Sequence, residues 1–239
     1  MWSYYGSKRK IAKHYPEPVR KTIIEPFAGT AAYSMYGDRW KKEVTLVDKY
    51  SVIVDIWKYL QQASEKDIRR LPNMSKGDKV TDHKHLTVVE RSLIGFCINR
   101  GNPRPVITAN NYNNWNRDRE KIADNLYKIR HWTIVEGSYT DIDPNIDATW
   151  FIDPPYQVKG YKYKHNKIDF KNLSKWVEKL EGQVIVCENV GANWLEFDPL
   201  VEFTGVGGKN NEAIYYRERN GFYTNLERRG KTVAGGNCR

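Results

Sequence analysis

Five short runs of β-forming, apolar residues constrain the fold of this chain more than any other feature. The runs are TIIE at 22–25, VTLV at 44–47, WTIV at 132–135, TWFI at 149–152 and QVIVCE at 183–188. Each is nearly continuous rather than alternating, the pattern of strands buried on both faces of a parallel sheet. Residues 51–63 and 170–180 are apolar at helical spacing, with Asp169 the expected N-cap of the second helix and Gly182 its stop. This alternation predicts an α/β fold.

A charge-rich segment between the second and third runs does not follow this alternation of strands and helices. Helices are expected there at 83–99 and 116–130, around an Asn-, Pro- and Gly-rich loop. Further on, KNNEAIYY at 209–216 is expected to be a late strand, with its Asn and Glu as turn residues. The expected parts are a catalytic domain at 1–63 and 132–225, an insertion at 64–131 and a flexible basic tail at 226–239.

The net charge of the chain bears on the kind of molecule that it binds. The 239 residues carry a net charge of +10, which fits either a solvated basic surface or the footprint of a polyanion. Three scattered cysteines and five histidines lack the spacing of a disulfide framework or a metal site. No apolar run approaches the roughly 20 residues of a membrane span. We therefore expect a cytoplasmic protein with neither metal nor membrane segment.

The first candidate site is the loop IIEPFAGTAA at 23–32, between the first strand and an expected helix. Gly29 would let the backbone approach a ligand, and Asp48 ends the next strand, where an acidic residue can take two ribose hydroxyls. Ala31 breaks the dinucleotide pattern GxGxxG. Glu25 would repel phosphate and suits an amino group, which favours a nucleoside with an amino-acid end. An ordinary strand-to-helix turn is the alternative.

The second candidate site is Asp-Pro-Pro-Tyr at 153–156, directly after an apolar run. Each proline fixes its own φ and restricts the preceding residue, which holds Asp153 and the Pro154 carbonyl in set directions. Two acceptors converging on one point suit an NH2 group, and the ring of Tyr156 can stack on a heterocycle. This chemistry fits methylation of an exocyclic base amine, whereas the alternative is a stiff loop with a capping aspartate.

Three motifs in order, YYGSK at 4–8, EPFAGT at 25–30 and DPPY at 153–156, resemble the Dam-type (class D12, α-group) adenine-specific DNA methyltransferase family. The resemblance covers roughly residues 1–225. It implies a Rossmann-like, S-adenosylmethionine-dependent methyltransferase fold with a mostly parallel sheet, a late antiparallel strand and a helical DNA-recognition insertion.

The resemblance also assigns residues. The implied catalytic residues are Asp153, Pro154, Pro155 and Tyr156. The residues implied to bind S-adenosylmethionine are Tyr4, Tyr5, Gly6, Ser7, Lys8, Glu25, Pro26, Phe27, Ala28, Gly29, Thr30, Asp48, Lys49, Ser138, Tyr139 and Asp153. Two positions depart from the family pattern: Ala31 replaces the usual last glycine of the loop, and Ser138 stands where an acidic residue often meets the adenine of the donor. Either Asp141 substitutes for that acid or the affinity for the donor is modest.

DNA contacts are expected from two stretches that mix cations, amides and aromatic rings. The expected residues are Asn99, Arg100, Asn102, Arg104, Asn113, Trp115 and Arg117 in the insertion, and Tyr161, Lys162 and Lys164 in the basic loop 159–167. Tyr161 and Tyr163 are expected to close over an extruded base, with solvent-facing charge as the alternative. Lys8 is expected to reach the donor or the base.

The function expected from these residues is site-specific methylation of the N6 amino group of adenine in duplex DNA by base flipping. Three alternatives stay open: methylation of cytosine at N4, an RNA substrate, and an inactive DNA-binding module. We expect a monomer or weak dimer in a bacterial or phage-infected cell. Restriction-modification is a possible context for this family, but the sequence gives no sign of a cognate restriction nuclease.

Overall fold

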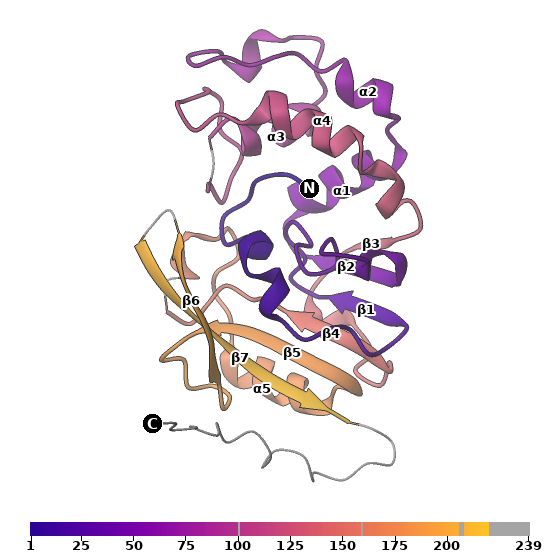
Figure 1. Cartoon of the computed structure of the whole chain (residues 1–239), viewed down its shortest axis with the longest axis vertical. Coiled ribbons are helices and arrows are strands. Elements are labelled where there is room, and N and C mark those ends of the chain that lie inside the picture. The colour runs from indigo at the N-terminus through magenta and orange to yellow at the C-terminus, as the bar shows by residue number, and fades with distance from the viewer. Residues whose placement is uncertain (100, 159, 206–207, 220–239) are drawn as a thin grey trace, which may run out of the picture.

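The computed structural model describes residues 1–99, 101–158, 160–205 and 208–219, and a seven-stranded sheet forms its centre (Figure 1). The strand order is β3-β2-β1-β4-β5-β7-β6. The strands are β1 Thr22–Glu25, β2 Glu43–Asp48, β3 Thr133–Glu136, β4 Ala148–Ile152, β5 Gly182–Asn189, β6 Asp198–Gly205 and β7 Gly208–Glu218. β1 to β5 pair in parallel, and β7 runs antiparallel between β5 and β6. The expected Rossmann-like α/β fold with a late antiparallel strand is confirmed.

The α-helices are α1 Ser51–Gln62, α2 Glu65–Arg69, α3 Val88–Cys97, α4 Trp115–Ala123 and α5 Phe170–Lys179. The Asp169 carboxylate caps α5 by accepting a hydrogen bond from the Asn172 amide at 3.0 Å, as expected. Gly182 is not the stop of that helix, because it begins β5 with φ 85°. A Cβ there would lie 2.4 Å from the Ala148 carbonyl oxygen, so glycine lets β5 approach β4.

Two expectations about the strands and the donor loop are wrong. β3 is mostly exposed rather than buried on both faces, because it is an edge strand with β2 as its neighbour. In contrast, β4 lies between two strands and is buried throughout. No helix follows Gly29: residues 30–38 form turns, and Ala31 adopts a left-handed φ of 46°, which an α-helix does not allow.

The segment 64–131 contains α2, α3 and α4, which gather in the upper part of Figure 1, away from β5, β6 and β7. α3 begins later than expected because Thr87 and Glu90 form a capping box at its start. α4 ends early, and a 3-10 helix follows at Leu126–Ile129. α1 contacts β2, β3 and α3, and so connects this segment to the sheet. That the segment is a separate domain stays a prediction, and the tail 226–239 lies outside the described residues.

Two apolar clusters lie on opposite faces of the sheet. Successive residues of β4 point to different clusters: Phe151 packs with Tyr33 on one side, and Trp150 packs with Trp176 of α5 on the other. The strand order reverses between β1 and β4, so their carboxyl ends diverge into a crevice, the place where open α/β sheets bind ligands. No described helix is both long and apolar enough to cross a membrane.

Candidate active site

A cavity of about 370 Å³ lies at the carboxyl ends of β1, β2 and β4. Its size is in the ordinary range of small-molecule sites, roughly 300–1,000 Å³. Its walls include every residue that the sequence assigned to the methyl donor: Tyr4, Tyr5, Gly6, Ser7, Lys8, Glu25, Pro26, Phe27, Ala28, Gly29, Thr30, Asp48, Lys49, Ser138, Tyr139 and Asp153. The structure therefore gathers three distant motifs around one cavity.

Asp48 is held rigidly at the end of β2. Its carboxylate accepts the Gly29 amide at 3.0 Å and the Tyr50 amide at 2.8 Å. The Gly29 carbonyl in turn accepts the indole N–H of Trp57 at 2.9 Å. Burial raises the pKa of Asp48 to about 6, although these amide hydrogen bonds oppose the shift. Each oxygen keeps a further lone pair, so the carboxylate can still accept ligand hydroxyls.

Glu25 forms the acidic floor of the donor loop at the end of β1. It is only 2% exposed, and its Oε1 accepts the Ser34 amide at 2.9 Å. Burial raises its pKa to about 7 in spite of this hydrogen bond. A cationic group in the cavity would stabilise the ionised carboxylate, so Glu25 is suited to receive an amino group.

The part of the cavity wall near Ser138 is aromatic. The rings of Phe27 and Tyr139 lie 5.7 Å apart, and both side chains line the cavity. Asp141 was expected to replace an acid at Ser138, but its Oδ2 accepts the Ser138 amide at 2.7 Å and caps a 3-10 helix. Asp141 is also not among the described residues that line the cavity, so it does not act as that substitute in this structure.

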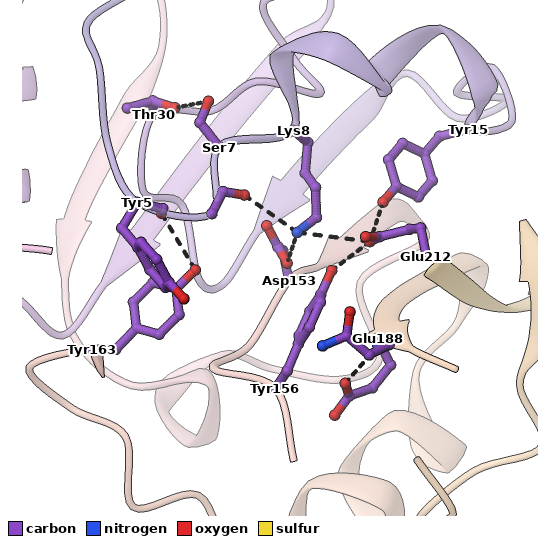
Figure 2. A network of polar contacts seen from close by, with 12 residues as sticks. Tyr5, Ser7, Lys8, Tyr15, Thr30, Asp153, Tyr156, Tyr163, Glu188 and Glu212 are labelled. Carbon is purple, nitrogen blue, oxygen red and sulfur yellow. Dashed lines mark hydrogen bonds and ion pairs between the residues drawn. The ribbon is translucent and has the colours of Figure 1, made fainter. Parts of the chain in front are cut away.

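The DPPY motif places its carboxylate next to a buried lysine. Lys8 Nζ lies 2.9 Å from Asp153 Oδ1 and 4.4 Å from the centroid of the Tyr156 ring (Figure 2). The same nitrogen lies 3.7 Å from Glu212 Oε1 and donates to the Gly6 carbonyl at 3.3 Å. Lys8 was expected near the donor or the base, and it contacts both Asp153 and Tyr156.

The charges of this pair follow from its surroundings. Burial raises the pKa of Asp153 to about 6; Lys8 opposes that shift and Glu212 adds to it. Burial alone would lower the pKa of Lys8, but Asp153 and Glu212 raise it above its ordinary value. At neutral pH, therefore, Asp153 is mostly a carboxylate and Lys8 is a cation.

Two residues that the sequence did not single out complete this network. Glu212 lies on β7 with 2% exposure, and its Oε1 accepts hydrogen bonds from the hydroxyls of Tyr15, at 2.6 Å, and Tyr156. The expectation that Glu212 is a turn residue is wrong. A glutamate within a β-rich run was the available signal, whereas nothing in the sequence marked Tyr15.

Residues 160–167 of the basic loop lie against the N-terminal motif. Tyr163 donates its hydroxyl to the Tyr5 carbonyl at 3.3 Å, and a Cβ on Gly6 would lie 1.8 Å from that hydroxyl oxygen. Gly6 also has φ 74°, so two constraints require glycine there. Tyr161, Lys162 and Lys164 are exposed beside this contact and remain candidates for DNA binding.

The candidates for DNA contact in the segment 64–131 divide into exposed or half-buried residues and residues whose side chains point inward. Arg104 and Arg117 are exposed, and the Asn102 carbonyl accepts the Tyr5 amide at 3.2 Å, which joins the segment to the site. Asn99 is half-buried, and its carbonyl accepts the Asn102 side-chain amide at 2.8 Å. Arg100 lies outside the described residues.

Two of these candidates point inward. Trp115 is fully buried and its indole N–H donates to the Pro72 carbonyl at 2.8 Å, so its assignment to DNA binding is wrong for this structure. The Asn113 side chain donates to the Met74 carbonyl at 2.7 Å and accepts the Trp115 amide at 2.9 Å. Its polar atoms therefore stabilise the segment.

No three His, Cys, Asp or Glu side chains could hold a metal ion within residues 1–99, 101–158, 160–205 and 208–219.

Comparison with known proteins gives one informative match. No curated protein matches the chain. A solved structure, a conserved hypothetical protein of Streptococcus pyogenes, is 10% identical over 87% of this chain and 91% of that one; its TM-score of 0.34 supports no conclusion. Residues 4–91, which hold the first two motifs and Asp48, match the model of the D12 class N6 adenine-specific DNA methyltransferase family. This match confirms the resemblance to the D12 class over residues 4–91, and the DPPY motif lies outside it.

Proposed function

We propose that this protein transfers a methyl group from S-adenosylmethionine to the N6 amino group of an adenine extruded from duplex DNA. The observation that carries the proposal is the position of Asp153, at the rim of the cavity that Glu25, Gly29 and Asp48 also line. The D12 match over residues 4–91 supports adenine methylation in DNA.

The cavity has the groups that S-adenosylmethionine requires. Asp48 has lone pairs for the ribose hydroxyls, Glu25 is a buried acid for the amino group, and the Phe27 and Tyr139 rings offer an apolar wall for the adenine. When bound, the donor supplies an electrophilic methyl group.

The DPPY motif prepares the acceptor nitrogen. Asp153 and the Pro154 carbonyl would accept the two hydrogens of the amine, which frees the nitrogen lone pair from the ring. The Asp153 carboxylate stabilises the positive charge that develops as the new C–N bond forms. With a pKa of about 6, Asp153 can also take the proton that the nitrogen then releases. Tyr156 would stack on the base, which must leave the duplex to reach this site.

Contacts with DNA would come from exposed cations. Arg104 and Arg117 project from the segment 64–131, and Lys162 and Lys164 from the loop beside Tyr5. The net charge of +10 supports attraction to phosphates.

The proposal is tested by incubating the protein with labelled S-adenosylmethionine and mixed-sequence duplex DNA or RNA, and then digesting each product to nucleosides. Label in N6-methyl-2′-deoxyadenosine from duplex DNA is expected. Label on cytosine alone would refute the adenine assignment, and label in RNA alone would refute the DNA assignment. Absence of label despite measured donor binding would leave a DNA-binding module as the explanation.

A further inference from the structure

Lys8 occupies the two groups that the target base is proposed to use. Its ammonium pairs with Asp153 Oδ1 at 2.9 Å and lies over the Tyr156 ring at 4.4 Å. An adenine amine bound to Asp153, with its ring on Tyr156, would meet this ammonium. The side chain of Lys8 must therefore move before the base can bind.

A second carboxylate lies within reach of that movement. Glu212 Oε1 is 3.7 Å from Lys8 Nζ, an ion pair longer than the one with Asp153, and a small rotation of the flexible lysine stem would shorten it. The hydroxyls of Tyr15 and Tyr156 both donate to this oxygen (Figure 2). These hydrogen bonds fix the glutamate on β7 before any base arrives.

We propose that Lys8 shifts between two carboxylates, pairing most closely with Asp153 in the free protein and with Glu212 when the target amine binds. Glu212 is then a positioning residue, which acts through Lys8. This inference rests on the proposed function, because the amine is what displaces the lysine.

The switch has an electrostatic advantage. A cation that remained on Asp153 would oppose the positive charge developing on the methylated nitrogen. When the cation moves to Glu212, the negative charge of Asp153 is no longer compensated by Lys8 and can stabilise the amine. Lys8 stays paired and does not become an isolated buried charge. In the free protein the same lysine compensates the charge of Asp153, which would otherwise be buried beside Glu212.

The test compares Glu212→Gln with Tyr15→Phe in single-turnover methylation, at saturating donor and DNA. Glu212→Gln removes the second carboxylate, so Lys8 stays on Asp153; we expect the rate to fall about 30-fold while donor affinity is kept, consistent with the loss of a charged hydrogen bond. Tyr15→Phe removes one donor to Glu212 but keeps all three charges, and is expected to stay within about three-fold of wild type. Glu212→Asp retracts the charge and should fall between these variants; it also serves as the test if Glu212→Gln does not fold.

The pH profile separates a switch from a packing defect. Glu212 raises the pKa of Asp153, so the acid limb of the rate should move to lower pH in Glu212→Gln. An unmoved limb, equal losses in Glu212→Gln and Tyr15→Phe, or a wild-type rate in Glu212→Gln would overturn the switch. Failure of the wild-type protein to methylate any duplex would instead refute the proposed function, and the switch with it.

Discussion

The carboxyl edge of the sheet and the segment 64–131 both carry polar residues that the sequence assigned to binding or catalysis. These residues differ in where their side chains lie in the structure. At the sheet edge, all the residues assigned to the donor line one cavity. In the segment 64–131, Arg104 and Arg117 face solvent, but Trp115 and Asn113 bond to the backbone around them.

The difference shows what fixes the direction of a side chain. Glu25, Asp48 and Asp153 each end or follow a parallel strand, so the sheet itself brings them to one edge. Trp115 and Asn113 were assigned from the composition of their stretch, which does not say which way a side chain points. Positions tied to strand ends are therefore the ones whose location in this chain can be predicted from the sequence.

The largest expected effect is at the sheet edge. Asp153→Asn removes the charge proposed to stabilise the reacting amine, and the methylation rate should fall about 1,000-fold. The control is Asp147→Asn, at the opposite end of β4, where the exposed carboxylate pairs with Arg20 and should tolerate the change. A fully active Asp153→Asn would show that this carboxylate is not catalytic.

Trp115→Ala tests whether the Trp115 side chain stabilises the segment 64–131 rather than contacting DNA. Loss of this fully buried ring should lower the free energy of unfolding by about 3–5 kcal/mol, measured by denaturant titration. Trp115→Phe keeps most of the packing and should bind DNA as wild type does. If Trp115→Phe instead lost DNA affinity at unchanged stability, the side chain would contact DNA after all.

Asp48→Asn should weaken binding of S-adenosylmethionine by about 10- to 100-fold, because a charged acceptor for the ribose becomes neutral. Calorimetric titration measures the affinity. Glu43→Gln, at the start of the same strand and exposed, is the matched control. Equal affinities for wild type and Asp48→Asn would remove Asp48 from the donor site.

The sequence predicted most of the sheet, and it picked out residues that the structure gathers around one cavity, because both follow from local patterns. It missed Glu212 as a partner of Lys8 because this contact depends on β7 pairing with β5. Glu212 likewise meets Tyr15 across a separation of 197 positions. It also gave β3 two buried faces, since an apolar run does not reveal whether its strand lies at the edge of the sheet.

The pH dependence should follow Asp153. Its pKa of about 6 is raised from the ordinary value, so the reactive carboxylate is lost as the pH falls through about 6. At saturating donor, the rate at pH 5 should be about one-tenth of its plateau value. Saturation matters because Asp48 and Glu25 also have raised pKa values and line the cavity proposed for the donor. A rate that stays flat down to pH 4.5 would contradict the raised pKa.

The smallest expected effect belongs to the exposed cations of the segment 64–131. Arg104→Ala and Arg117→Ala should each weaken DNA binding a few-fold and reduce the steepness of its log–log salt dependence by about 0.9. Lys179→Ala removes an exposed cation from α5 and is the control. An unchanged salt slope in both arginine variants would show that neither side chain contacts phosphate.

The central claim is that the sheet-edge site methylates adenine through Asp153. Its most direct test is modification sequencing of DNA from cells that express either the wild-type protein or Asp153→Asn. We predict N6-methyladenine in one short sequence context with the wild-type protein, and its loss with Asp153→Asn. An identical modification pattern in both strains, or a modified cytosine in place of adenine, would contradict the account.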